Sequence, residues 1–324
     1  MNGGGFSRRG WLLLGVMAVL WGVPYLFISI AVESLSPPAV VAGRTLLAAA
    51  LLVPFALRSG VLRPALRRWR WVLAFGAIEM AGPFLLLGHA ELTLSSGITG
   101  LLVATVPLFG ALVALGSGDR GVLRPSRIIG LLVGFAGVAL VVLGPGATGG
   151  QLNFLAAAEV LLVAVLYAIA PFIVAHKLAG VPALGTITLS LTMVGIVYLP
   201  IGLLTQHSVP TVASLLSLVV LAVVCTAIAF LAFFALIREV GPARAPLFTY
   251  LNPVVAIVLG AIVLAEPLTP GLLVGFPLVI AGCWLAATGG RLRPATKALP
   301  VTTGAIPLPT DSGRPGSGFD VLRE

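Results

Sequence analysis

Ten apolar runs constrain this chain more than any other feature of its sequence. Each run has the length of about 20 residues that an α-helix needs to cross the hydrocarbon core of a bilayer. The runs cover 11–32, 38–57, 71–89, 96–115, 128–144, 154–175, 183–204, 212–236, 243–264 and 270–288. The sequence therefore predicts an all-α integral membrane protein with ten transmembrane helices.

The loops between these runs alternate in their content of basic residues. Lys and Arg occur before the first run, after the last run, and in or beside the second, fourth, sixth and eighth loops, whereas the other loops contain none. Cytoplasmic loops of membrane proteins carry the excess of Lys and Arg. We therefore expect a multi-pass protein of the cell (inner or plasma) membrane with both termini in the cytoplasm. Arg44 is the one basic residue away from that side.

Composition excludes several other classes of protein. Only 9% of the residues are charged and the mean hydropathy is +1.14, whereas soluble chains carry about 25% charged residues. The net charge of +9 comes from basic residues scattered over the loops, so no nucleic-acid partner is expected. Cys225 and Cys283 lie in apolar runs without the spacing of metal ligands, so they are interpreted as small buried hydrophobes. We predict no metal and no cofactor.

The second half of the chain repeats landmarks of the first at an offset of 146 residues. Pro107 aligns with Pro253, and Trp21 with Tyr167. Each half contains five runs, and because five is odd, the second half must cross the membrane in the opposite sense. Such inverted repeats are typical of secondary transporters. The expected organisation is a cytoplasmic N-terminus (1–10), a first five-helix repeat (11–144), an outer linker (145–153), a second five-helix repeat (154–288) and a disordered cytoplasmic tail (289–324).

Glycines spaced four apart predict close helix packing. Gly130 and Gly134 form such a pair in the fifth run, and Gly271 and Gly275 form another at the start of the tenth. Small residues at this spacing let two helix backbones approach each other. We expect the fifth and tenth helices to pack together within the chain. A homodimer contact is the alternative, so the protein is predicted to be a monomer or a homodimer.

Several short motifs occur in a fixed order between residues 11 and 288. They are Leu20-Trp21-Gly22, Arg44-Thr45-Leu46-Leu47-Ala48, Glu79-Met80-Ala81-Gly82-Pro83-Phe84, Val106-Pro107-Leu108-Phe109, Asn252-Pro253-Val254-Val255 and Leu264-Ala265-Glu266-Pro267-Leu268. In their order and spacing the chain resembles an EamA-type carrier of the drug/metabolite transporter superfamily. The resemblance implies movement of small metabolites, often amino-acid-like, usually outward and without ATP. The chain departs from the family pattern after the fourth run, where Gly118-Asp119 replaces the usual Gly-Glu pair.

Glu79 is a carboxylate placed deep inside a predicted span. It lies about eight residues into the third run, or about 12 Å from the inner edge at the rise of an α-helix. An ionisable side chain at that depth is costly and usually faces a cavity or a partner. We predict a transport or proton-coupling role for Glu79, with a structural, hydrogen-bonded carboxyl as the alternative.

Arg44 and Glu159 each enter their span from the outer side. Both lie about six residues deep, at about 1.5 Å per residue, so a buried ion pair between them is possible. Removing one partner of such a pair costs about 3–5 kcal/mol. For Arg44 we favour this structural role over contact with substrate. For Glu159 structure and coupling stay equally open.

Aromatic and amide side chains within the spans are candidates for a substrate pathway. Trp and Tyr combine an apolar face with a hydrogen-bonding tip, which suits amphipathic solutes such as amino acids. The candidates are Trp21, Tyr25, Tyr167, Tyr250 and Asn252. The alternative is that these side chains pack between helices or lie at the lipid interface.

Four further polar residues lie near the ends of runs. His89 and Glu91 are expected at a loop edge or at the mouth of the pathway on the outer side. His207 is expected in solvent within its loop, and Glu266 is interpreted as a polar residue at a helix end.

The preferred interpretation is a secondary transporter, and not an enzyme, that exports a small amino-acid-like or amphipathic solute by alternating access. Its partners are then the solute and the bilayer. A lipid-linked-sugar flippase or a membrane scaffold is the alternative. A remote alternative is an intramembrane aspartyl protease, suggested by Gly116-Ser117-Gly118-Asp119. Such an enzyme needs a second aspartate facing the first, but Asp119 lies in an arginine-rich loop and the other aspartates, Asp311 and Asp320, lie in the tail.

Overall fold

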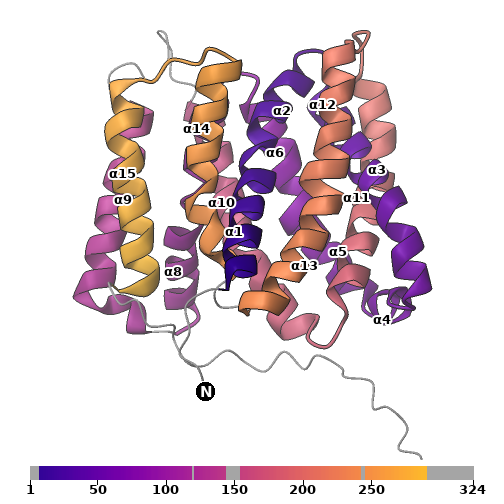
Figure 1. The fold of residues 1–324 in the computed structure, drawn as a ribbon, viewed down its shortest axis with the longest axis horizontal. Helices are drawn as coiled ribbons and strands as arrows, with labels where there is room; N and C mark the ends of the chain where they lie inside the picture. The colour runs from indigo at the N-terminus through magenta and orange to yellow at the C-terminus, as the bar shows by residue number, and fades with distance from the viewer. Residues whose placement is uncertain (1–6, 119, 144–153, 242–244, 290–324) are drawn as a thin grey trace, which may run out of the picture.

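Helices make up every regular element that the structure, a computed structural model, describes (Figure 1). The description covers residues 7–118, 120–143, 154–241 and 245–289. The α-helices are α1 (Arg8–Gly22), α2 (Pro24–Val32), α3 (Pro37–Arg58), α4 (Leu62–Arg67), α5 (Trp69–Gly76), α6 (Gly82–Ala90), α7 (Ser96–Val103), α8 (Val106–Gly116), α9 (Pro125–Leu143), α10 (Phe154–Lys177), α11 (Ala183–Thr205), α12 (Val212–Ala222), α13 (Ala229–Val240), α14 (Asn252–Val263) and α15 (Pro270–Thr288). The π-helical turns are η1 (Ala77–Ala81) and η3 (Val223–Ile228), and the 3-10 turns are η2 (Arg120–Leu123) and η4 (Ala245–Tyr250).

Nine helical segments in the described part of the chain are long and apolar enough to cross a membrane. They match nine of the ten predicted runs. The remaining run, 243–264, differs because its helix is shorter, Leu247–Val263. A 3-10 turn precedes Leu251, and the α-helix starts only at Asn252 because Pro253 has no N–H to donate and fits the first turn of a helix.

Hydroxyl side chains cap the N-termini of five of the spans. The Oγ atoms of Ser7, Ser36, Ser95, Thr211 and Thr269 each accept a hydrogen bond of 2.9–3.4 Å from the backbone N–H three residues later. Such a cap contributes about 1 kcal/mol to helix stability. The cap at Ser7 explains why α1 begins at Arg8, three residues before the predicted start of the first run.

Two kinds of helix interruption recur at the predicted offset of 146 residues. The fourth span is interrupted at Ala104 and Thr105, between α7 and α8, and the equivalent span is interrupted at Leu251. The π-helical turns η1 and η3 begin at Ala77 and Val223, again 146 residues apart. These irregularities support the alignment of the two halves.

Equivalent helices of the two halves pack against each other in opposite directions. Gly130 of α9 faces Ala286 of α15, and Gly137 faces Val279, so the residue numbers rise along one helix and fall along the other. The pairs α3 with α11 and α7 with α14 show the same descending order. This arrangement agrees with the predicted inverted repeat. It also confirms the favoured prediction that the fifth and tenth helices pack together within the chain, with Gly130 and Gly134 in the contact.

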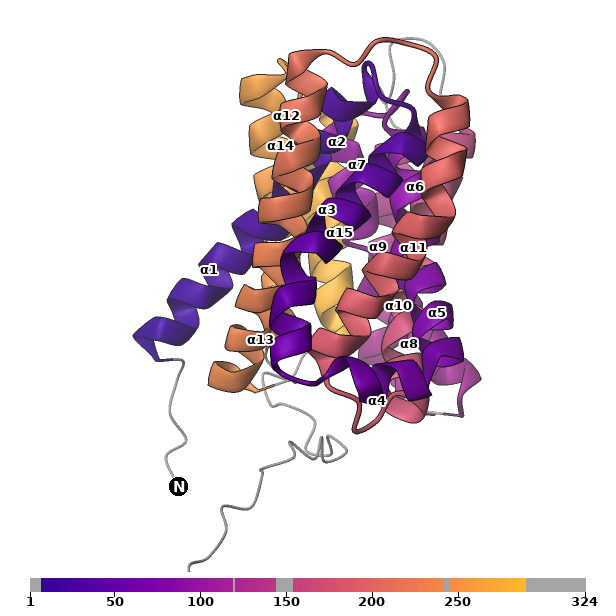
Figure 2. The ribbon, with the colours of Figure 1, turned by 90° about the vertical axis from the view of Figure 1, so that its right-hand side faces the viewer.

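One end of the bundle collects the loops that the sequence predicts to be basic. Figure 1 shows the start of α1, the end of α15, α4 and the ends of α8 and α13 at the same end. Figure 2 shows α1 leaning out of the bundle at that end, beside α13. Which end faces the cytoplasm stays a prediction. The predicted linker 145–153 and all but Gly289 of the predicted tail lie outside the described residues.

Candidate functional site

A cavity of about 460 Å³ lies inside the bundle between the two halves. This volume is in the range of binding sites for small molecules. Both repeats contribute to the wall at equivalent positions: Trp21 and Tyr167 are 146 residues apart, and so are Val106 and Asn252. The predicted pathway residues that line it are Trp21, Tyr25, Glu79, Tyr167 and Asn252. Tyr250 is not part of this lining and packs instead against a large cluster of buried hydrophobic side chains.

Glu79 lies in the π-helical turn η1 and is the one carboxylate among the described lining residues. A π-turn displaces side chains from the regular helical pattern and is common at functional sites. Tyr198 stabilises this turn by donating its hydroxyl to the Ala81 carbonyl at 3.1 Å. Within the described part of the chain the Glu79 carboxylate itself takes part in no hydrogen bond or ion pair. It is therefore available to the contents of the cavity.

Arg44 lines the same cavity from α3 and is only 5% exposed. Its Nε donates to the Thr226 hydroxyl at 2.9 Å, and its guanidinium lies over the Phe84 ring with Cζ 3.9 Å from the ring centre. Thr226 belongs to the π-helical turn η3 and donates in turn to the Leu221 carbonyl at 2.8 Å. Thr226 was not among the predicted site residues. Its run, 212–236, also contains Ser214 and Ser217, so a hydroxyl in this run did not by itself indicate a site residue.

The predicted buried pair between Arg44 and Glu159 is wrong. Glu159, on α10, instead contacts His89 of α6, whose Nδ1 lies 2.8 and 2.9 Å from the two carboxylate oxygens. Among the described residues no carboxylate lies within 4.0 Å of Arg44. The two side chains leave their helices toward different neighbours. His89 is accordingly a partner of Glu159 rather than an isolated residue at the loop edge.

Trp21 and Asn252 both line the cavity and hold helices together. The Trp21 ring packs against Phe230, Phe233 and Phe248 at centroid distances of 5.1–5.7 Å. With the amide oriented to satisfy its hydrogen bonds, the Asn252 nitrogen donates to the carbonyls of Phe248 at 3.0 Å and Ala18 at 3.3 Å. The packing role and the lining role, which the sequence posed as alternatives, therefore coincide at these residues.

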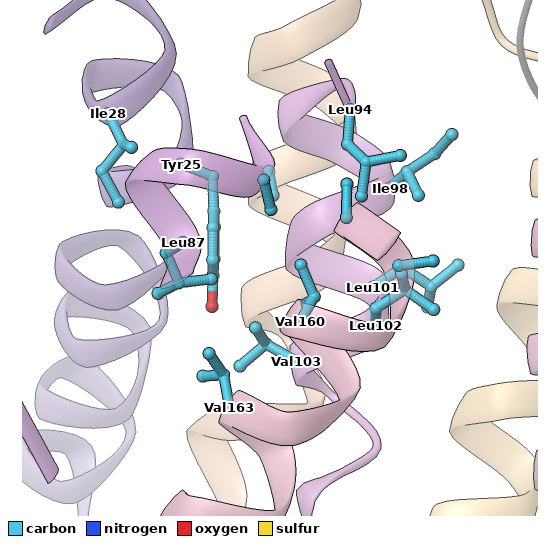
Figure 3. Close-up of a cluster of buried hydrophobic side chains, with 14 of the residues drawn as sticks. Tyr25, Ile28, Leu87, Leu94, Ile98, Leu101, Leu102, Val103, Val160 and Val163 are labelled. Carbon is cyan, nitrogen blue, oxygen red and sulfur yellow. The ribbon is translucent and has the colours of Figure 1, made fainter. Parts of the chain in front are cut away.

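Several residues that line the cavity also belong to a large cluster of buried hydrophobic side chains, part of which is drawn in Figure 3. On α2 and α6 the lining ends at Ile28 and Leu87, and residues further along each helix, such as Val32 and Ala90, belong to the cluster. Figure 3 shows the Tyr25 hydroxyl oxygen on the side of Val103 and Val163. Beyond Ile28 and Leu87, buried hydrophobic side chains of α2 and α6 adjoin the cavity.

Two carboxylates follow the C-terminal ends of helices α6 and α14. Glu266 accepts hydrogen bonds from the backbone N–H groups of Ser96 at 2.7 Å and Gly97 at 3.1 Å. It therefore caps α7 of the other half, where the helix dipole favours negative charge. Glu91 is 5% exposed and neither of its oxygens has a hydrogen bond of normal geometry, although the Ser29 backbone is close. Burial, and next the Glu266 charge, raise the pKa of Glu91 well above its ordinary value.

Comparisons with known proteins agree with this architecture. The profile of the EamA-like transporter family matches residues 8–143 and 155–288. The "Uncharacterized inner membrane transporter YedA" of Escherichia coli is 28% identical over 292 residues, which cover 87% of this chain and 92% of that protein. The "Probable terminal-alkyne amino-acid exporter" of Streptantibioticus cattleyicolor is 28% identical over 296 residues, 90% and 97% of the two chains. A solved crystal structure aligns with a TM-score of 0.60 at 22% identity over 89% of this chain and 100% of the other, which supports the fold alone.

Proposed function

Because this chain belongs to the EamA-like transporter family, we propose that it exports a small amphipathic, amino-acid-like solute by alternating access, without ATP. The observation that carries the proposal is the cavity between two antiparallel halves, whose wall includes one arginine and one carboxylate within an otherwise largely apolar and aromatic lining. Secondary transporters bind their solutes at such an interface between repeats.

In this mechanism the two halves move around the cavity and expose it to each side in turn. The buried hydrophobic side chains beyond Ile28 and Leu87 must separate for the solute to leave toward the predicted outer side. The helix interruptions at Ala104, Thr105 and Leu251, next to the lining, are suitable points for bending. Glu79 takes up and releases the coupling proton, because an ionisable group inside a bundle without a fixed partner responds to its occupant.

The outward direction and the class of solute are supported by the similarity of this chain to a named relative. A relative with nearly the same length carries the name of a probable amino-acid exporter. The aromatic side chains Trp21, Phe172 and Phe230 in the lining suit the apolar part of such a solute. No aspartate is present in the described lining, whereas an intramembrane aspartyl protease needs two. ATP-driven pumping lacks support because neither lysine of the chain follows a glycine.

The test is an untargeted comparison of metabolites inside and outside cells that lack, express or overexpress the protein. We expect at least one small amphipathic solute to accumulate outside in proportion to expression. Collapse of the proton gradient should abolish this accumulation, whereas lowering ATP at a maintained gradient should not. A metabolite profile that is independent of expression would contradict the proposal, and so would export that follows ATP rather than the gradient.

A further inference from the structure

Arg44 is the one cation in the described wall of the cavity, and the protein holds it in a defined orientation. Its Nε is occupied by Thr226, and one face of the guanidinium is covered by Phe84. Arginine carries five N–H donors in a rigid fork. The four donors on its two Nη atoms make no hydrogen bond within the described part of the chain. The end of the fork is therefore fixed in place but unoccupied by protein.

The charge of this guanidinium lacks a close counter-charge in the described residues. Glu159 pairs with His89, and Glu79 lies on the cavity wall but beyond 4.0 Å. Glu91, just after the end of α6, makes no ion pair with Arg44 either. A buried cation without a close partner is costly, so a ligand that brings an anion into the cavity gains a strong interaction.

We propose that the Nη edge of Arg44 binds the carboxylate of the transported solute, so that the solute is a small carboxylic acid with an apolar body. This inference rests on the proposed transport function and narrows its substrate class. A planar carboxylate matches the fork of an arginine with two parallel hydrogen bonds. The remaining wall offers Phe84, Met80 and Leu87 to the apolar body. An amino acid would in addition present its ammonium group to a cavity that contains Glu79.

The first experiment varies the ligand and leaves the protein unchanged. Full-length protein in lipid nanodiscs is titrated at pH 7 with L-leucine, L-methionine and L-phenylalanine, with their carboxamides, and with the corresponding acids that lack the amino group. The shift of the melting temperature with concentration yields each affinity, because a ligand stabilises only the folded state it binds. We expect the acids to bind at least about tenfold more tightly than the carboxamides, as loss of a charge-assisted hydrogen bond requires.

The acids that lack the amino group distinguish two classes of carboxylate ligand, simple carboxylic acids and amino acids. Binding as tight as that of the amino acids assigns the site to simple carboxylic acids. Weaker binding assigns it to amino acids. Carboxamides that bind as well as the acids would overturn the proposal, and so would a panel in which no acid binds.

The second experiment varies Arg44. In Arg44→Gln the affinity for the acids should fall about 10- to 100-fold, to the level of the carboxamides, and Arg44→Lys should recover part of it. Arg58→Gln is the matched control, since Arg58 lies exposed at the end of the same helix, and it should bind like the wild type. Unchanged acid affinity in folded Arg44→Gln would show that Arg44 only packs. Export of a solute without a carboxylate would refute this inference and leave the proposed transport intact, whereas absence of any exported solute would refute both.

Discussion

The carboxylates inside the bundle differ in their hydrogen-bond and ion-pair partners. Glu159 pairs with His89, and Glu266 accepts two backbone hydrogen bonds. Glu79 and Glu91 have no such partner among the described residues. An ionised group without a partner is costly away from water, so these two side chains are expected to respond to protons or ligands rather than to stabilise the fold.

Replacing Glu79 by Gln tests the coupling role. The amide keeps the size of the side chain but cannot release a proton, so transport driven by a pH gradient should fall to the level of empty liposomes while expression is unchanged. The measurement is solute flux in proteoliposomes with and without a pH gradient, and Glu33→Gln, at an exposed position, is the control. Flux equal to that of the wild type under both conditions would remove Glu79 from the mechanism.

Replacing Glu91 by Gln tests the effect of burial on stability. A carboxyl whose pKa is raised in the folded state folds best when protonated, so its contribution is fully present in acid and is lost as the pH rises through the raised value. Gln mimics the protonated form at every pH. The melting temperature of Glu91→Gln should therefore match the wild type in acid and exceed it above neutral pH. A difference that does not change with pH would contradict this account.

Among the helices, α9 and α15 form a seam at which their backbones approach closely. Gly134 and Gly282 face each other there, and a Cβ on Gly282 would collide with the Gly134 backbone. The collision cannot be relieved by rotating a side chain, because the atoms in contact belong to the main chain. Close backbone approach, rather than interlocking of large side chains, joins the fifth and tenth spans.

The substitution Gly282→Ala should therefore destabilise the protein by about 1–3 kcal/mol, the usual cost of overpacking. Gly15→Ala is the matched control, since an added Cβ at Gly15 meets no atom within 4 Å and alanine favours the helix. Thermal unfolding in the same detergent measures both variants. Equal melting temperatures for the two would show that the seam tolerates a wider spacing.

For the whole molecule, equivalent helices of the two halves pack antiparallel, and both halves contribute to the wall of the cavity. In the proposed mechanism, a relative movement of the halves would change access to the cavity without rebuilding the site. Buried hydrophobic side chains adjoin the cavity beyond Ile28 and Leu87, and Glu266 links the second half to α7 of the first half. Opening there, as we propose, would separate these contacts.

The predicted topology can be checked with reporters. A reporter after residue 324 and one before residue 1 should be cytoplasmic, whereas a reporter placed within 145–153 should be on the outer side, because five spans separate that segment from either terminus. Fluorescence and phosphatase fusions report the two locations. A terminal reporter and the 145–153 reporter on the same side would contradict the inverted repeat.

Local patterns were sufficient to predict most of the fold. Hydropathy acts over a few residues through transfer of side chains and backbone to lipid, so it indicated ten apolar runs, nine of which are long helices in the described part of the chain. Trp21 and Tyr167, which the repeat offset aligned and which were candidates for the pathway, both line the cavity. Glu79, predicted from its position within a span to face a cavity or a partner, lines the same cavity.

Only the tertiary structure decided which side chains meet. In a helix that is apolar on every face the sequence has no periodicity to indicate how the helix is rotated, and a shift of one residue turns a side chain by about 100°. The pairing of Arg44 with Thr226 instead of Glu159, the pairing of Glu159 with His89, and the packing of Tyr250 outside the cavity all depend on that rotation. The sequence was sufficient to predict these residues as candidates. Which partner each side chain contacts is determined by how its helix is rotated against the neighbouring helices.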